Sequence, residues 1–500
     1  MPHTLSRRAF LRASAAATSI SLVGVGPALG AAGGFETPLA IPPLETGRLE
    51  GGMRIFNLTM QNGTHEFFKG YHTPTKGINA SYLAPVLRLN KGEMTHFNVT
   101  NALGHDTTLH WHGFNLPGVA DGGPHQVIRD GATWQPSFRI LEEAATMWFH
   151  AHEMHETAPQ VWAGLAGMAI IDDADGPTGL PREYGVDDIP LVLQDRRFQL
   201  NGTMPYSPSM HDRMAGMHGN YPVINGTIAP YLEVTREAVR LRLLNGSNAS
   251  IYNLAFSDKR AFQVIGSDGG LLNAPVEMQM LTLAPGERAE IVVRVTAGEP
   301  VVLHSLAAQG GRRGGMMGGG MMRGAMMGGM GVQSPEFAML QLRPAARLDP
   351  APALPARLAS LPVPDAGAAT NTRQFLLEMG MGPAMRMGGG FTINGKAMDM
   401  ARIDHVIKQG ETEIWEIGNP GPMAHPFHVH NTQFRILSRN GQPPAAHEAG
   451  RKDTVLVQPG ERVQILIRFD HYADPEAPYM FHCHILEHED AGMMGQFTVV

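Results

Sequence analysis

Residues 480–493 read Met-Phe-His-Cys-His-Ile-Leu-Glu-His-Glu-Asp-Ala-Gly-Met, and they contain the only cysteine in the chain. One thiol cannot form an internal disulfide, so Cys483 is expected to have a chemical role. The stretch combines a thiol, imidazoles and a thioether, which are the ligand types of a blue-copper electron-transfer site. On an extended strand, the flanking His482 and His484 point away from the thiol. The stretch therefore predicts two metal sites that are joined through one short peptide.

Three more groups of closely spaced histidines occur earlier in the chain. Residues i and i+2 of a strand share one face, so each pair can present both rings to one cavity. A single pair is more often a feature of an ordinary core, but four groups ending in His-Cys-His indicate metal binding. The three earlier groups are His110 and His112; His150 and His152; and His425, His428 and His430. With residues 482–493 they supply ligands for four copper ions.

Internal recurrences predict the architecture. Residues 148–152 and 480–484 share a pattern, Trp-Phe-His-Ala-His against Met-Phe-His-Cys-His. Ala-Pro-Gly-Glu-Arg at 284–288 similarly matches Gln-Pro-Gly-Glu-Arg at 458–462, and an alternating strand follows each. Such repetition predicts a triplicated domain of about 150 residues. Short alternating strands between Gly, Pro and Asn turns predict an all-β sandwich. A third recurrence, alternating residues that end in an Asn-containing turn, covers 87–101, 232–248 and 405–419.

Composition sets the predicted boundaries. Asp172 to Pro177 closes the first domain, and the Pro/Ala-rich tract from Arg343 to Thr370 is expected to link the second and third. Residues 310–331 are paired methionines set in glycine, so we expect this insert to be disordered or loosely packed. The predicted order is a signal peptide at 1–32, domain 1 at 33–175, domain 2 at 176–345 with the insert, a linker at 346–370, and domain 3 at 371–500.

The N-terminus carries an export pattern. Residues 6–12 read Ser-Arg-Arg-Ala-Phe-Leu-Arg, and an apolar, Ala-rich run follows to about Gly30. This is typical of a twin-arginine signal. A basic arm or a membrane anchor is the alternative, but the apolar run is short and is broken by Pro27. We expect cleavage near Gly30 or Ala32 and a protein in the periplasm or otherwise exported.

The net charge and the lack of long apolar segments argue against nucleic acid and membrane partners. The net charge is −7 and there is no Lys/Arg-rich tract, so nucleic acid is not an expected partner. No segment beyond the leader is long and apolar enough to span a bilayer, so no stable membrane association is expected. The 500 residues suit three domains, and we expect a monomer.

As a set, these motifs resemble the multicopper oxidases, and the C-terminal stretch is most similar to the bacterial periplasmic cuprous oxidase and laccase-like branch. The resemblance covers nearly the whole mature chain, including residues 425–437, the neighbourhood of 445–447 and the final block. It implies three cupredoxin-like Greek-key β-sandwich domains. Because the histidine motifs fall only in the first and third, those two domains are expected to meet face to face.

The resemblance also implies roles for the ligands. The type 1 copper, which accepts electrons, would be held by His425, Cys483 and His488 with Met493 as a weak axial ligand; Met494 is the adjacent alternative. Three further coppers would form the oxygen site. His110 and His428 would hold the type 2 copper, and the two type 3 coppers would be held by His112, His150 and His484 and by His152, His430 and His482.

Two acids match positions that deliver protons in the family. They are Asp121, in Val-Ala-Asp-Gly-Gly-Pro, and Glu489, directly after His488. A solvated or capping acid is the alternative for each. His155 lies close to the second histidine pair, but its spacing does not match a ligand, so a supporting or surface position is expected.

The predicted activity is oxidation of Cu(I) and/or phenolic and aromatic-amine donors, with molecular oxygen reduced to water. Soft thioethers select Cu(I), so residues 310–331 favour copper handling, with an incidental insertion as the alternative. In the resembled cuprous oxidases, however, the methionine-rich insert lies in the third domain. Gly421 also stands where their substrate-copper site has an acid, whereas Met423 matches.

There are two competing functional hypotheses. One has a different electron donor, and the other has no enzymatic activity. A laccase proper would act mainly on organic donors, with Cu(I) incidental. A copper-binding or division-associated structural protein would share the scaffold, but such relatives have lost the ligands, and here every ligand position is filled. A copper nitrite reductase is disfavoured, because three domains and two N-terminal His-x-His motifs exceed its needs.

Overall fold

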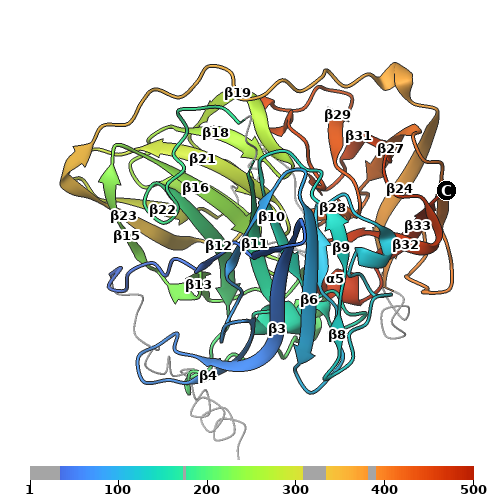
Figure 1. Ribbon diagram of the computed structural model, residues 1–500, viewed down its shortest axis with the longest axis horizontal. Helices are drawn as coiled ribbons and strands as arrows, with labels where there is room; N and C mark the ends of the chain where they lie inside the picture. Colours follow the sequence, from blue (N-terminus) through green and yellow to red (C-terminus); the bar gives the residue numbers. More distant parts are fainter. Residues whose placement is uncertain (1–33, 173–175, 308–333, 381–389) are drawn as a thin grey trace, which may run out of the picture.

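The computed structural model describes residues 34–172, 176–307, 334–380 and 390–500, and within these ranges the chain consists mainly of β-strands (Figure 1). The prediction of an all-β fold is therefore confirmed. The strands form six sheets in the described part of the chain, two in each of three successive units. The predicted signal peptide and the insert at 310–331 lie outside the described residues.

The first unit holds a five-stranded sheet, β1-β5-β11-β10-β7, and a second sheet built on β2-β3-β6-β8 with β4 and β9 at its sides. Helix α2 lies between its last two strands. The bounds are β1 Leu44–Glu45, β2 Arg48–Glu50, β3 Met53–His65, β4 Thr73–Ile78, β5 Val86–Asn90, β6 Met94–Ala102, β7 His110–His112, β8 Thr133–Trp134, β9 Ser137–Arg139, β10 Ala145–His150, α2 Thr157–Ala163 and β11 Ala166–Asp172.

The second unit pairs a seven-stranded sheet, β14-β13-β12-β16-β21-β18-β19, with a five-stranded sheet, β15-β23-β22-β17-β20. The bounds are β12 Asp188–Arg196, α3 Met210–Ala215, β13 Tyr221–Ile224, β14 Thr227–Ile228, β15 Tyr231–Arg236, β16 Ala238–Asn245, β17 Tyr252–Phe256, β18 Phe262–Ser267, β19 Gly270–Met278, β20 Leu281–Leu283, β21 Arg288–Arg294, β22 Val301–Ser305 and β23 Phe337–Asp349. Strand β23 extends to Asp349, which pairs with Arg236 of β15, so the strand runs into the predicted linker.

The third unit has two five-stranded sheets, β25-β24-β27-β31-β29 and β26-β33-β32-β28-β30. The bounds are β24 Asn371–Met379, β25 Phe391–Ile393, β26 His405–Ile407, β27 Thr412–Gly418, β28 His425–Val429, β29 Phe434–Arg439, β30 Thr454–Val457, β31 Arg462–Arg468, β32 Asp474–Cys483, α5 Leu486–Asp490 and β33 Met494–Val499. Figure 1 shows this unit in orange and red, across from the second unit in green and yellow.

Burial along the strands explains the layers. In β6, residues that are buried alternate with residues that are partly exposed, as expected of a strand with one face on a core. Strands β10, β12 and β16 are instead buried at every residue, because other units cover their outer faces. These three strands therefore mark where the units meet.

The first and third units share one hydrophobic core. A single cluster of buried side chains runs from Phe56 and Trp111 of the first unit to Trp415 and Phe481 of the third. The second unit has its own separate cluster, which includes Leu241 and Leu254. The first and third units thus meet face to face, as the placement of the histidine motifs led us to expect.

A buried ion-pair network joins the first and second units. Glu290 of β21 is fully buried, accepts a hydrogen bond from Thr146 Oγ1 of β10 at 2.6 Å, and pairs with Arg240 and with Arg242 Nη1 at 3.0 Å. Arg242 also forms two hydrogen bonds to Asp188, at 2.7 and 2.8 Å. Charge is balanced inside this network, so each member depends on its partners.

Replacing Glu290 with Gln should lower the free energy of unfolding by about 3–5 kcal/mol, because two guanidinium groups would lose a shared buried carboxylate. Denaturant unfolding of metal-free protein measures this change. A midpoint equal to that of the unmodified protein would contradict the importance of the network.

Candidate metal centres

Strand pairing brings the four histidine motifs together. Strand β7 pairs antiparallel with β10, so His110 lies opposite His150 and His112 lies opposite Trp148. In the third unit β28 pairs antiparallel with β32, which places His428 opposite His482. The motifs sit at strand ends that face the boundary between the first and third units.

Eight of the predicted histidines form one buried cluster across this boundary. Each of the eight side chains is fully buried. Their ring nitrogens gather in three groups, within which the potential ligand atoms lie within 4.8 Å of one another. The groups are His110, His428 and His430; His112, His150 and His484; and His152, His430 and His482.

For four of these rings, one nitrogen is held by a hydrogen bond and the other has no hydrogen-bond partner among the described residues. The held nitrogen must carry the proton, because its partner is a carbonyl or carboxylate oxygen. The free nitrogen then offers a lone pair, as in metal-binding histidines. The held nitrogens are His110 Nδ1 on the Asp121 carbonyl (2.9 Å), His150 Nδ1 on the Ala151 carbonyl (2.9 Å), His428 Nδ1 on the Asp453 carbonyl (2.8 Å) and His112 Nε2 on Asp453 Oδ1 (2.9 Å).

Three other rings point their Nε2 atoms at one another. His482 Nε2 lies 3.2 Å from His152 Nε2 and 3.2 Å from His430 Nε2. His430 Nδ1 donates to Asp121 Oδ2 at 2.8 Å, and His482 Nδ1 lies 3.1 Å from Glu489 Oε2. With both protons on Nδ1, the facing Nε2 lone pairs repel unless a cation lies between them. The residues therefore fit a metal cluster.

Burial favours the neutral form of six of these imidazoles. Desolvation lowers the pKa of each of the six, and neighbouring imidazoles lower it further. Neutral imidazole is the form that coordinates a metal. The rings with a lowered pKa are His112, His150, His152, His428, His430 and His484.

The thiol of Cys483 belongs to a separate group on the other face of β32. Its Sγ lies 3.4 Å from His425 Nδ1 and 3.7 Å from His488 Nδ1, and all three residues are fully buried. His488 Nε2 donates to the Met214 carbonyl at 3.0 Å, which leaves Nδ1 as a lone pair facing the sulfur. Burial raises the pKa of Cys483, so a thiolate here requires a bound cation.

Met493 is anchored beside this group. The Cys483 amide donates to the Met493 carbonyl at 3.0 Å, and the Met493 amide donates to the His488 carbonyl at 2.9 Å. Its side chain is fully buried in the shared core. Met494, the alternative, lies opposite His482 in the β32–β33 pairing and lines a small cavity with Phe481. These contacts favour Met493.

Both predicted acids touch the histidine cluster. Asp121 accepts from His430 through its carboxylate and from His110 through its carbonyl. Glu489 lies 3.4 Å from His152 Nδ1 and 3.1 Å from His482 Nδ1. Burial alone would raise the pKa of Glu489, but the two imidazoles hold it below its usual range. His155 is exposed and bonds to the Asp490 carbonyl, in keeping with a surface position.

Sequence reasoning missed Asp453 and its neighbour Thr454, which both contact the cluster; Thr454 Oγ1 lies 3.2 Å from His112 Nε2 and 3.2 Å from His428 Nδ1. Asp453 accepts a hydrogen bond from His112 through its carboxylate and from His428 through its carbonyl. Its carboxylate is paired with Arg288 of the second unit. Asp453 and Arg288 are far apart in the chain and neither carries a histidine motif, so no local pattern connects them. The Pro-Gly-Glu-Arg recurrence at 285–288 was the one available signal.

A cavity of about 630 Å³ opens next to the thiol group. It lies where α2, α3, β25 and α5 converge, so all three units line it. Met214 lines the cavity and its carbonyl bonds to His488; Phe391 also lines it and stacks on His488 with 4.3 Å between ring centroids. Only Met214 or Phe391 would therefore separate a molecule in the cavity from His488, which belongs to the same group as the Cys483 thiol.

The same cavity is lined by thioethers, aromatic rings and acids. Burial raises the pKa of Glu487 to about 7, and its Oε2 has no hydrogen-bond partner among the described residues. The lining includes Met210, Met214, Tyr206, Phe391, Glu487 and Asp490.

Comparisons with known proteins agree with this geometry. Two family models, both described as multicopper oxidase, match residues 59–176 and 367–500. A multicopper oxidase of Staphylococcus haemolyticus is 34% identical over 90% of this chain and 89% of its own length. The cell division protein FtsP of Edwardsiella tarda is 36% identical over 99% of both chains. The solved structure of a laccase-like multicopper oxidase from Ochrobactrum sp. is 38% identical, with a TM-score of 0.81 over 93% of this chain and 100% of the other.

Proposed function

Since this chain belongs to the multicopper oxidase family, we propose that it oxidises Cu(I) and/or phenolic and aromatic-amine donors one electron at a time and reduces O2 to water. The family membership makes the chain a copper oxidoreductase that uses oxygen; the donors and a role in copper tolerance are the proposal. The observation that carries it is the complete set of converging ligands, which a non-enzymatic relative would not need.

Four copper ions fit the donor groups. His425, Cys483, His488 and Met493 would hold a type 1 copper. His110 and His428 would hold a type 2 copper, and the two type 3 coppers would be held by His112, His150 and His484 and by His152, His430 and His482. When bound, these ions would supply the one-electron oxidation of a donor and the four-electron reduction of oxygen.

The protein itself positions the ligands, connects the two groups of ligands and excludes water. Cys483 lies on β32 directly between His482 and His484, so two peptide units join the thiol group to the histidine cluster. Full burial of the cluster keeps bulk water away from the reacting oxygen. Asp121 and Glu489 contact ring nitrogens of three cluster histidines, where each can hold a proton and pass it inward.

Both donor classes suit the cavity beside His488. Thioethers of Met210 and Met214 suit Cu(I), and the carboxyl groups of Glu487 and Asp490 belong to the same lining. Phe391 and Tyr206, with the same acids, suit a phenol or an aromatic amine. The substrate-copper position of the resembled cuprous oxidases has no counterpart acid here, since Gly421 has no side chain and Met423 is buried in the shared core. The cavity is therefore the better candidate.

The alternatives are a laccase acting mainly on organic donors and a structural protein related to FtsP. The second is supported by 36% identity to a cell division protein over nearly the whole chain. The converging ligands argue against it. We further propose export by the twin-arginine route to the periplasm and a monomeric state; among the described residues, no helix is long and apolar enough to cross a membrane.

Replacing Cys483 with Ser should abolish both the intense blue colour and oxygen consumption, because a serine hydroxyl does not reproduce the copper–thiolate bond. Visible absorption and oxygen-electrode assays of copper-loaded protein measure the two effects. Survival of the blue band in this variant would rule out the assignment of Cys483.

Replacing Glu489 with Gln should slow reoxidation of reduced protein by oxygen roughly 100-fold or more, because the carboxylate beside His152 and His482 is lost. Stopped-flow mixing follows the return of the blue colour. Glu487→Gln is the matched control: it lies on the same helix but faces Tyr206 and Asn248, so reoxidation should be unchanged. Equal rates for Glu489→Gln and unmodified protein would exclude this proton route.

The donor class is tested by oxygen consumption with Cu(I) and with a phenol, before and after deletion of residues 310–331. We expect copper content to stay constant while the ratio of Cu(I) to phenol turnover changes, because the deleted thioethers prefer Cu(I). Equal effects on both donors would remove the copper-handling role of the segment. Strong phenol turnover with negligible Cu(I) turnover would instead identify a laccase proper.

A further inference from the structure

We propose that Asp453, clamped by Arg288 of the second unit, is a positioning residue that fixes which nitrogens of His112 and His428 face the oxygen site. The inference rests on the proposed function and assigns a role to a unit that supplies no ligand to the four groups. Asp453 is fully buried and directly precedes β30, which begins at Thr454.

Asp453 holds one ligand from each of the two units that share the cluster. Its Oδ1 accepts from His112 Nε2 at 2.9 Å, and its carbonyl accepts from His428 Nδ1 at 2.8 Å. The two rings stack with 3.7 Å between centroids and 13° between planes. These bonds leave His112 Nδ1 and His428 Nε2 as the lone pairs that face the cluster. A flip of either ring would turn an N–H toward the metal.

Arg288 fixes the carboxylate in turn. Its Nη1 and Nη2 donate to Asp453 Oδ1 and Oδ2 at 2.7 and 2.5 Å, a two-bond pairing that sets the plane of the carboxylate. The same guanidinium donates through Nε to the Thr146 carbonyl at 3.1 Å and through Nη2 to the Asp268 carbonyl at 3.0 Å. Arg288 thereby connects the second unit to the first and the third.

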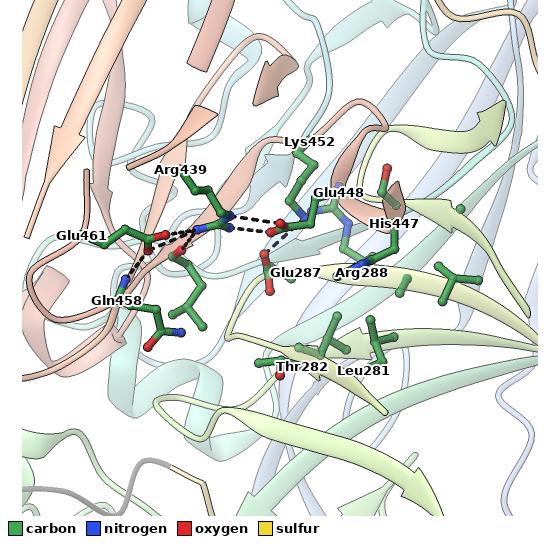
Figure 2. A pocket seen from close by; sticks show the side chains of 16 residues that line it. Leu281, Thr282, Glu287, Arg288, Arg439, His447, Glu448, Lys452, Gln458 and Glu461 are labelled. Carbon is green, nitrogen blue, oxygen red and sulfur yellow. Dashed lines mark hydrogen bonds and ion pairs between the residues drawn. The ribbon is translucent and has the colours of Figure 1, made fainter. Parts of the chain in front are cut away.

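More buried charges support this pair. Lys452 Nζ lies 3.0 Å from Asp268 Oδ2 and 3.2 Å from Glu287 Oε1, which ties the residue before Asp453 to the second unit. Figure 2 shows the ion pair between Lys452 and Glu287, with Arg288 labelled close to them. All three side chains line a cavity of about 270 Å³. Buried ion pairs are weak evidence for stability, because desolvation offsets their attraction. A network that ends on two ring nitrogens of the oxygen site is better explained by ligand placement.

The test compares three variants of the full-length, copper-loaded protein. Asp453→Asn turns an N–H₂ group toward Arg288 and breaks the two-bond pairing. Arg288→Lys keeps the charge but cannot make both bonds and reach Thr146 and Asp268 as well. Glu290→Gln is the matched control: it lies on the same strand, is equally buried and also touches β10, but it contacts no histidine.

Four signals are measured: copper per chain, the blue absorption of type 1 copper, the electron paramagnetic resonance of type 2 copper, and oxygen consumption. We expect both network variants to keep the blue absorption, to alter or lose the type 2 signal, and to lose turnover roughly 10- to 100-fold. Glu290→Gln should keep all four signals per folded chain.

The inference is overturned if Asp453→Asn and Arg288→Lys match Glu290→Gln in the type 2 signal and in turnover. If Asp453→Asn does not fold, Arg288→Lys decides alone by the same two signals. Failure of the proposed function looks different, because the unmodified protein would then bind no copper at the cluster or consume no oxygen.

Discussion

The structure depends on imidazole lone pairs that face one another inside the buried boundary between the first and third units. His152, His430 and His482 direct three Nε2 atoms at a common point, and their protons are held on the other side by Asp121 and Glu489. Burial removes the water that could separate the lone pairs, and it lowers the pKa of His152 and His430, which removes the extra proton from those two rings. A bound cation is the remaining way to satisfy the arrangement.

This constraint explains the division of labour among the three units. The first and third share one hydrophobic core, which holds the two halves of the histidine cluster in register. The second has its own core and supplies buried charges such as Arg288, which reaches the boundary from behind. We propose that electrons arrive from the opposite direction, where the cavity lined by Met214 and Phe391 adjoins His488. In this proposal, donor oxidation and oxygen reduction take place on opposite sides of the end of β32, which carries His482 and Cys483.

The sequence was sufficient for the fold class and for the residues that converge, because the i, i+2 spacing of histidines and the internal repeats are local patterns. The positioning role of Asp453 could not be predicted, because it depends on Arg288. That residue lies in another unit and pairs with Asp453 only after folding. The cavity beside His488 could not be predicted from the sequence either, since Met214, Phe391 and Glu487 come from three separate segments. Residues 310–331 lie outside the described ranges, so the expectation about their order stays a prediction.

We propose that one chain collects four electrons and delivers them together to one oxygen molecule. The most direct measurement is an anaerobic reductive titration of copper-loaded protein, followed by a single addition of oxygen and an assay for peroxide. We expect uptake of four electrons per chain, complete return of the blue colour, and water as the product. Release of peroxide, or uptake of a single electron with no transfer to oxygen, would contradict it.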